Sequence, residues 1–310
     1  MNEDFRKYLV TEPRYELCNN VRNRQSPIMT LLSSSQLKEA SHYLTAGWIY
    51  GVPEPNPCTG EHKHNHDEII FFIGSDHHTP QVLGAEIEFY LARQRIIFNT
   101  TAAVYIPGGL THGPLIWRDV SKPHLQVSLM VGTGSYEADD LKVETGQSEQ
   151  KVRHLNADFD YEQYVVRSPI REAGAEFIKG RTSPTLTYLS GLHIPGLKYY
   201  VEFGWTFDIP VSKRASSGNQ MPPMAHEQYE EIVLHIGGDP DNPEDLGADM
   251  EFHVGGQPLL FSNTSALFIP KGLVHGPIKL LQYRKPHIVM AIMLGAGSVK
   301  EGWGNSFKIS

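Results

Sequence analysis

The chain has 310 residues, a formal net charge of −8 and no run of basic residues, so we expect neither a nucleic-acid partner nor electrostatic binding to a membrane. Hydrophobic residues make up 40% of the sequence, and its apolar runs are far shorter than the roughly 20 residues that cross a bilayer. The first ten residues are charged and do not resemble a signal peptide, so we expect a cytoplasmic location.

The elements predicted in the first half of the chain are short β-strands. They cover residues 42–50, 68–74, 85–91, 102–108 and 124–132. In each, apolar alternation or a short apolar run is bounded by glycine, proline, asparagine or aspartate. Helical periodicity is expected only near residues 168–180. Many short strands separated by turn signals indicate a sandwich or a barrel.

The sequence from Glu68 to Gly134 recurs without a gap 163 residues later, from Glu231 onward. The clearest match is between YIPGGLTHGP at 105–114 and FIPKGLVHGP at 268–277. Because similarity of this extent does not arise by chance, the chain is one structural unit written twice. A duplicated unit of short strands predicts two barrels in one chain.

The segment 135–160 is polar, lacks apolar periodicity and is interpreted as a linker. We therefore predict two domains, an N-terminal barrel with its linker at 1–150 and a C-terminal barrel at 151–310. For the first 25 residues two placements remain open, on their own barrel or on the other one.

Residues 62–68, HKHNHDE, concentrate three histidines and two carboxylates. In an extended strand alternate side chains share a face, so His62, His64 and Glu68 could converge on one point. A fourth ligand must come from elsewhere, and the best candidate is His112 in the glycine-rich PGGLTHGP. Imidazole nitrogen with carboxylate oxygen suits a divalent transition metal with open coordination positions. The alternative is a polar loop and a packed histidine.

These motifs resemble those of the bicupins. The first cupin motif is HxH, three or four residues, Glu and a later Gly, found here at His62, His64, Glu68 and Gly74; the second is PxGxxH, which ends here at His112. The resemblance covers both repeats. It implies an all-β fold of tandem cupin jelly-roll barrels, with a metal in the mouth of the first barrel held by these three histidines and the glutamate. Fe or Mn is the expected metal, and Zn or Ni is an alternative.

Three further residues are candidates for catalysis in the first repeat. His66 lies within the histidine cluster, as a rim residue or a proton-transfer group. His124, in KPH, is a candidate proton-transfer group, although the recurrence of KPH at His287 favours a structural hydrogen bond. Tyr105 could line the cavity, and the second repeat has Phe268 in its place.

The second repeat departs from the metal motif. The offset of 163 places Ala225 and Glu227 opposite the two histidines of the first motif, and alanine cannot bind a metal. We therefore expect a barrel that supports the first one without a metal of its own. The alternative is a second site built from Glu227, Glu231 and His275 with either His226 or His235.

A cupin resemblance does not determine the reaction, because the fold hosts many chemistries. We expect a metal-dependent oxidoreductase of dioxygenase type that acts on a small organic molecule. The alternatives are a metal-dependent lyase, isomerase or hydrolase, and a non-enzymatic protein that binds a small molecule. A homodimer is an open alternative. The two cysteines, Cys18 and Cys58, form no CxxC motif and predict no disulfide framework.

Overall fold

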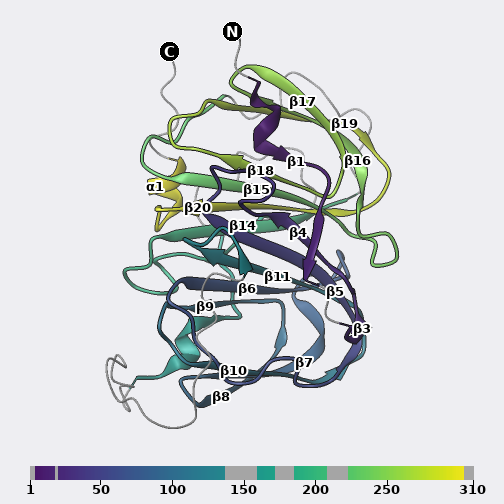
Figure 1. Cartoon of the computed structure of the whole chain (residues 1–310), viewed down its shortest axis with the longest axis vertical. Helices are drawn as coiled ribbons and strands as arrows, with labels where there is room; N and C mark the ends of the chain where they lie inside the picture. The colour runs from purple at the N-terminus through teal and green to yellow at the C-terminus, as the bar shows by residue number, and fades with distance from the viewer. Residues whose placement is uncertain (1–3, 18–19, 137–158, 172–184, 208–222, 304–310) are drawn as a thin grey trace. The chain divides into compact units, whose positions relative to one another are not determined.

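The computed structural model is built almost entirely from β-strands, and this confirms the predicted all-β class (Figure 1). It describes residues 4–17, 20–136, 159–171, 185–207 and 223–303. Within these ranges the α-helical structure is confined to α1 (Val299–Trp303). No helix in the described part of the chain is long and apolar enough to span a membrane.

The chain forms two compact units. The first unit is Arg14–Arg167, and the second unit combines Met1–Pro13 with Ser168–Ser310. The predicted boundary between residues 150 and 151 lies outside the described residues, as does most of the helical pattern expected near 168–180.

The first unit consists of two antiparallel sheets. The strands of the larger sheet, in pairing order, are β12 (Val165–Val166), β9 (Ala102–Ile106), β6 (Asp67–Gly74), β11 (His124–Val131), β5 (His42–Glu54), β4 (Ile28–Leu32) and β2 (Arg14–Leu17), and β3 (Arg22–Arg24) also pairs with β5. The smaller sheet contains β10 (His112–Val120), β7 (Val82–Leu91) and β8 (Gln94–Thr100). Strand β6 is buried along nearly its whole length, which explains its continuous apolar run.

The second unit repeats this arrangement. Its larger sheet contains β1 (Leu9–Val10), β18 (Ser265–Ile269), β15 (Glu230–Gly237), β20 (His287–Leu294), β14 (Tyr199–Thr206) and β13 (Leu186–Leu189). Its smaller sheet contains β17 (Gln257–Asn263), β16 (Asp245–Val254) and β19 (His275–Tyr283). Each unit therefore has the two facing sheets expected of a jelly-roll barrel, with apolar side chains packed between them.

A short arm completes the larger sheet of each unit. The N-terminal arm, residues 4–10, comprises the 3₁₀-helix η1 (Phe5–Tyr8) and β1, which pairs with β18 of the second unit. The linker arm, residues 160–166, comprises η3 (Tyr161–Tyr164) and β12, which pairs with β9 of the first unit. The beginning of the chain thus belongs to the unit of the second repeat up to Pro13, whereas β2 and β3 stay with the first.

Both arms dock through the same contacts. Gln257 accepts a hydrogen bond from the backbone N–H of Phe5 at 3.0 Å, and Gln94 accepts one from the backbone N–H of Tyr161 at 2.8 Å. An aspartate precedes each 3₁₀-helix and caps it with its side chain. The two arms are therefore equivalent elements of the duplication.

Candidate metal centre

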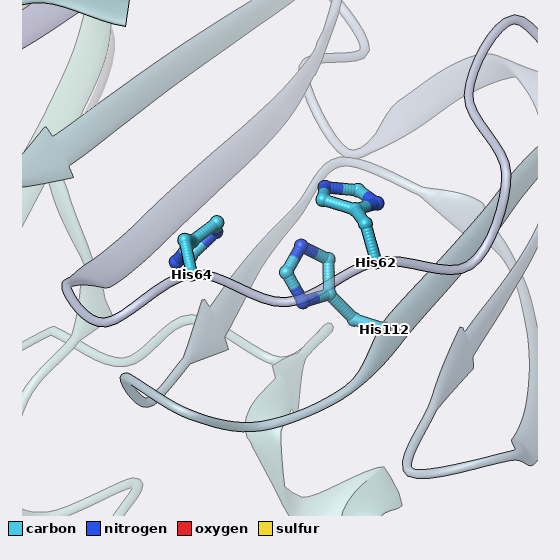
Figure 2. A group of neighbouring side chains, drawn as sticks. All are labelled: His62, His64 and His112. Carbon is cyan, nitrogen blue, oxygen red and sulfur yellow. The ribbon is translucent and has the colours of Figure 1, made fainter. Parts of the chain in front are cut away.

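Backbone pairing brings the two histidine motifs of the first unit together. His62 and His64 lie in the connection that precedes β6, and His112 opens β10. The backbone N–H of each of His62 and His112 donates to the carbonyl of the other, at 2.9 Å. As a result the nitrogen ligand atoms of the three histidines lie within 4.8 Å of one another, and Figure 2 shows the three rings gathered in one place. The predicted convergence of these three residues is present in the structure.

The glycine of the second motif permits this close approach. A Cβ on Gly108 would lie 2.5 Å from the carbonyl oxygen of Asn65, so any larger residue would push the two motifs apart. The backbone N–H of Gly108 donates to the carboxylate of Asp67 at 2.8 Å, and that of Gly109 donates to the carbonyl of His64 at 2.7 Å.

All three histidines have their tautomer fixed by a backbone carbonyl. Since a carbonyl oxygen only accepts, each Nδ1 must carry the hydrogen, and each Nε2 then presents a lone pair. The pairs are His62 Nδ1 with Gly60 O at 2.9 Å, His64 Nδ1 with His66 O at 2.8 Å and His112 Nδ1 with Leu110 O at 2.9 Å. Metal-binding histidines are oriented in this way in proteins.

The lone pairs face a buried carboxylate. Oε2 of Glu68 lies 3.1 Å from His64 Nε2 and 3.6 Å from His112 Nε2, and Oε1 accepts a hydrogen bond from Ser128 at 2.6 Å. Burial alone would raise the pKa of Glu68, but hydrogen bonds from protonated His112 and His64 would outweigh burial and lower that pKa. Burial lowers the pKa of the His62 imidazole, and His112 lowers it further, so His62 stays neutral.

This donor set fits a metal ion. Neutral imidazole lone pairs and an ionised carboxylate repel one another unless a cation lies between them. Ligands bound to one ion at about 2.0–2.2 Å lie roughly 3–3.5 Å apart, close to the two separations from Glu68. Three nitrogens and one oxygen leave coordination positions free on a metal that takes five or six ligands.

The cluster opens into a cavity of about 130 Å³. Its walls are apolar at Ile70, Phe89, Leu115 and Trp117. The polar side chains that line it, apart from the four candidate ligands, include Arg24, Thr45, Cys58, His66, Gln126 and Ser128. Within this wall, Nε of Arg24 and Oε1 of Gln126 are buried and have no hydrogen-bond partner among the described residues.

Arg24 brings a positive charge to the cavity. Burial lowers the pKa of its guanidinium, which nevertheless stays protonated at neutral pH. Its closest ionisable neighbour is the thiol of Cys58, and no carboxylate of the described residues forms an ion pair with it. Arg22 on the same strand differs, because it is exposed and pairs with Glu54. Sequence reasoning missed Arg24, since it lies 38 residues before His62 and outside both histidine motifs, although RQSP at 24–27 recurs as RTSP at 181–184.

His66 lies beside the candidate ligands. Its ring stacks on that of His64, with centroids 4.0 Å apart and an interplanar angle of 4°, and it lines the cavity. This position is compatible with the rim or proton-transfer role expected from the sequence.

Tyr105 and His124 have structural contacts and do not line the cavity. The hydroxyl of Tyr105 donates to Asp67 at 3.0 Å and thereby supports the loop between the two motifs. His124 is fully buried at the opposite end of β11 from the candidate ligands, where Nε2 accepts a hydrogen bond from Trp117 Nε1–H at 3.0 Å. Burial lowers the pKa of His124 to about 4. Both residues thus make structural hydrogen bonds outside the cavity, and their catalytic role stays a prediction.

In the second unit, the residues that are structurally equivalent to the first histidine motif are shifted by one from the sequence alignment. Met224 pairs through its backbone with His275, as His62 pairs with His112. Met224, and not Ala225, therefore takes the place of His62. The gapless offset was wrong here because the second repeat has one extra residue between this position and Glu231.

The same shift brings His226 into the place of His64. Oε2 of Glu231 lies 3.1 Å from Nε2 of His226 and 3.0 Å from Nε2 of His275. Burial alone would raise the pKa of Glu231, but these contacts lower it to about 2. Glu227 is exposed, and His235 packs against Phe261 away from the cluster. Of the alternatives considered for a second site, the structure brings together His226, Glu231 and His275.

The fold is similar to solved structures of oxalate decarboxylase. The Bacillus subtilis enzyme at pH 4.6 has a TM-score of 0.56 and 9% identity, covering 93% of this chain and 75% of that one. An oxalate decarboxylase structure concerned with substrate binding and a reaction specificity switch has a TM-score of 0.54 and 10% identity, covering 87% and 73%. AerE from Microcystis aeruginosa has a TM-score of 0.49 and 11% identity, covering 93% and 99%.

The two similarities to oxalate decarboxylase confirm the predicted fold of two tandem cupin barrels. At such identities they concern the fold alone. No protein-family model matches the sequence, and no curated protein matches it by sequence. Function therefore has to be inferred from the residues of the site.

Proposed function

We propose that the first unit is a metal-dependent enzyme that acts on a small organic acid by a dioxygenase-type oxidation. One observation carries this proposal: the histidine and glutamate donors open directly into a small cavity that also contains the Arg24 guanidinium. A purely structural metal site would have no reason to adjoin a charged pocket.

The cavity favours a substrate that carries a carboxylate. A buried guanidinium without a carboxylate partner among the described residues recognises planar anions well, because it presents parallel N–H donors. The apolar wall at Phe89 and Leu115 would accommodate the carbon skeleton, and the free amide oxygen of Gln126 would accept a hydrogen bond from a hydroxyl group. A volume of about 130 Å³ restricts the substrate to a small acid.

The first-unit residues divide into three roles under this proposal. His62, His64, Glu68 and His112 would hold the metal, and Ser128 would orient Glu68. A bound iron or manganese ion would supply redox chemistry and Lewis acidity at the floor of the cavity. His66, stacked on His64, would move protons, and Arg24 would position the carboxylate.

A lyase reaction, such as loss of CO₂ from the acid, is the second candidate. The placement of a carboxylate-binding arginine beside a Lewis acid favours it, and His66 would then protonate the product. Bound zinc or nickel, in place of iron or manganese, would favour the lyase over the dioxygenase. A protein that binds the acid without turning it over is the third.

The test uses the full chain loaded separately with iron, manganese or zinc. Oxygen uptake and CO₂ release are measured with a panel of small hydroxy, oxo, dicarboxylic and aromatic acids. Oxygen uptake that matches substrate loss supports the dioxygenase. CO₂ release that persists without oxygen supports the lyase instead.

Binding of an acid without turnover by any metal form would contradict both enzyme proposals. Absence of metal binding by the first unit would also contradict both enzyme proposals, and binding of the acid by the metal-free protein would then support the third. We also propose a cytoplasmic location, which cell fractionation would test.

A further inference from the structure

The second unit contains a cluster of metal donors in which a hydrogen bond to Nδ1 orients the ring of His226. The hydroxyl of Tyr229 donates to the carbonyl of Gly302 and lies 2.5 Å from Nδ1 of His226. Since the single hydroxyl hydrogen goes to Gly302, Nδ1 of His226 must donate to Tyr229. His226 therefore presents the lone pair of Nε2 to Glu231.

His275 is oriented in the same sense. Its Nδ1 donates to the carbonyl of Leu273 at 3.0 Å, so its Nε2 also presents a lone pair, 3.0 Å from Glu231 Oε2. Two imidazole lone pairs and a carboxylate oxygen thus meet at one point, as they do in the first unit. Such an arrangement is stable when a cation occupies the point.

Among the described residues this cluster is closed, whereas that of the first unit faces a cavity. His226, Glu231 and His275 are only 2%, 4% and 1% exposed. In the first unit, Tyr43, His62, Met130 and Tyr136 line the cavity. The residues at the equivalent places in the second unit are Tyr200, Met224, Met293 and Val299, which belong to one buried hydrophobic cluster. Within the described residues, apolar packing therefore occupies the side of the cluster that corresponds to this part of the first-unit cavity.

The C-terminal helix takes part in this closure. Val299 of α1 lies in the hydrophobic cluster, together with Met224 and Tyr229. The hydrogen bond from Tyr229 to Gly302 ties the helix to the side chain that orients His226. A chain of contacts thus connects the donor cluster to α1.

We propose that His226, Glu231 and His275 form a closed structural site for a divalent transition-metal ion, and that the bound ion holds α1 in place through Tyr229. The absence of an opening among the described residues distinguishes this three-donor site from the open four-donor centre of the first unit. The proposal does not depend on what the first unit catalyses.

The first experiment counts zinc in the full chain after the first centre has been removed by His62→Ala together with His112→Ala. The sample is dialysed and its zinc measured by elemental analysis. We expect about one zinc per chain, and loss of most of it when His275→Gln or His226→Gln is added. His253→Gln, at a histidine of the same unit outside the cluster, should leave the zinc unchanged. A folded protein that binds no zinc after removal of the first centre would overturn the proposal.

Access to the site is tested with Co²⁺. In the same His62→Ala, His112→Ala chain, azide should leave the visible spectrum of bound Co²⁺ unchanged, because the closed site has no room for an added ligand. In the His226→Gln chain, where only the first centre remains, azide should change it. An azide-dependent spectrum at the second site would overturn its assignment as closed.

The coupling to α1 is tested by hydrogen exchange at residues 299–303, with and without zinc. We expect zinc to slow exchange there about tenfold or more. Tyr229→Phe should retain the zinc but lose most of this protection. Equal exchange with and without zinc in the unsubstituted second unit would overturn the coupling.

Discussion

Met224 of the second unit and His62 of the first occupy equivalent backbone positions, each paired with the histidine that opens the following sheet strand, β19 or β10. The difference between a thioether and an imidazole at this place coincides with the difference between a packed interior and a cavity. This one position therefore links the number of metal donors in a cluster to whether the cluster faces a cavity.

The substitution His62→Met should weaken metal binding by the first unit without unfolding it. The imidazole contributes one of four donors, and the second unit shows that the fold accepts methionine here. We expect affinity to fall at least about tenfold, measured by competition with a chromophoric chelator. His78→Ala, at an exposed histidine of the same unit, should have no effect. Unchanged affinity of the His62→Met protein would show that His62 is not a ligand.

Replacement of Arg24 should weaken substrate binding and leave metal binding unchanged. Loss of a charge-assisted hydrogen bond of about 1.5–3 kcal/mol predicts that Arg24→Gln raises KM for an acid substrate about 10- to 100-fold. The number of metal ions per chain should not change. Arg22→Gln is the matched control, because Arg22 lies on the same strand but is exposed. Equal effects of the two substitutions would contradict a specific role for Arg24.

The buried His124 should make stability depend on pH. Its pKa is about 4 in the folded chain, below its ordinary value of 6.5. As pH falls from about 6.5 to 4, His124 binds a proton in the unfolded chain but not in the folded chain. The free energy of unfolding therefore decreases by up to about 3 kcal/mol and then levels off.

His124→Gln keeps an acceptor for Trp117 but does not titrate, so it should reduce this pH dependence. The measurement is the free energy of unfolding by urea at pH 7 and pH 4.5, with chelator present so that metal release does not contribute. Identical pH profiles for the two proteins would contradict a titrating role for His124.

Gln257 should control docking of the N-terminal arm. It accepts a hydrogen bond from Phe5 N–H and donates one to Asp4. Loss of about 1 kcal/mol in Gln257→Ala predicts about fivefold faster cleavage by trypsin at Arg6 and Lys7. Gln94→Ala, which disturbs the equivalent contact of the linker arm, should leave these two cleavages unchanged.

The fold could be predicted because the duplication repeats its strands, and the main cluster because its first motif is compact in the sequence. The period of two in the strands and the spacing of His62, His64 and Glu68 are local properties of the sequence. The place of His226 could not be predicted in the same way, because one extra residue in a loop shifts the alignment without changing the flanking matches.

Arg24 and the arms depend on tertiary structure. Arg24 reaches the cavity only through the pairing of β3 with β5, and no local pattern encodes that. The arms contribute strands of two residues, too short for a periodic signal. A signal nevertheless existed, because Asp4, Tyr8 and Val10 recur at Asp160, Tyr164 and Val166.

The placement of the arms also sets an order of events during synthesis. Leu9 pairs with Leu267, so the N-terminal arm leaves the ribosome some tens of seconds before its partner strand exists, at typical rates of about 5–20 residues per second. The linker arm pairs with a strand made about 60 residues earlier and can dock as soon as it emerges. The first unit can therefore finish its larger sheet while translation continues. The second unit must wait for β18, and during that time the N-terminal arm of the nascent chain stays unpaired.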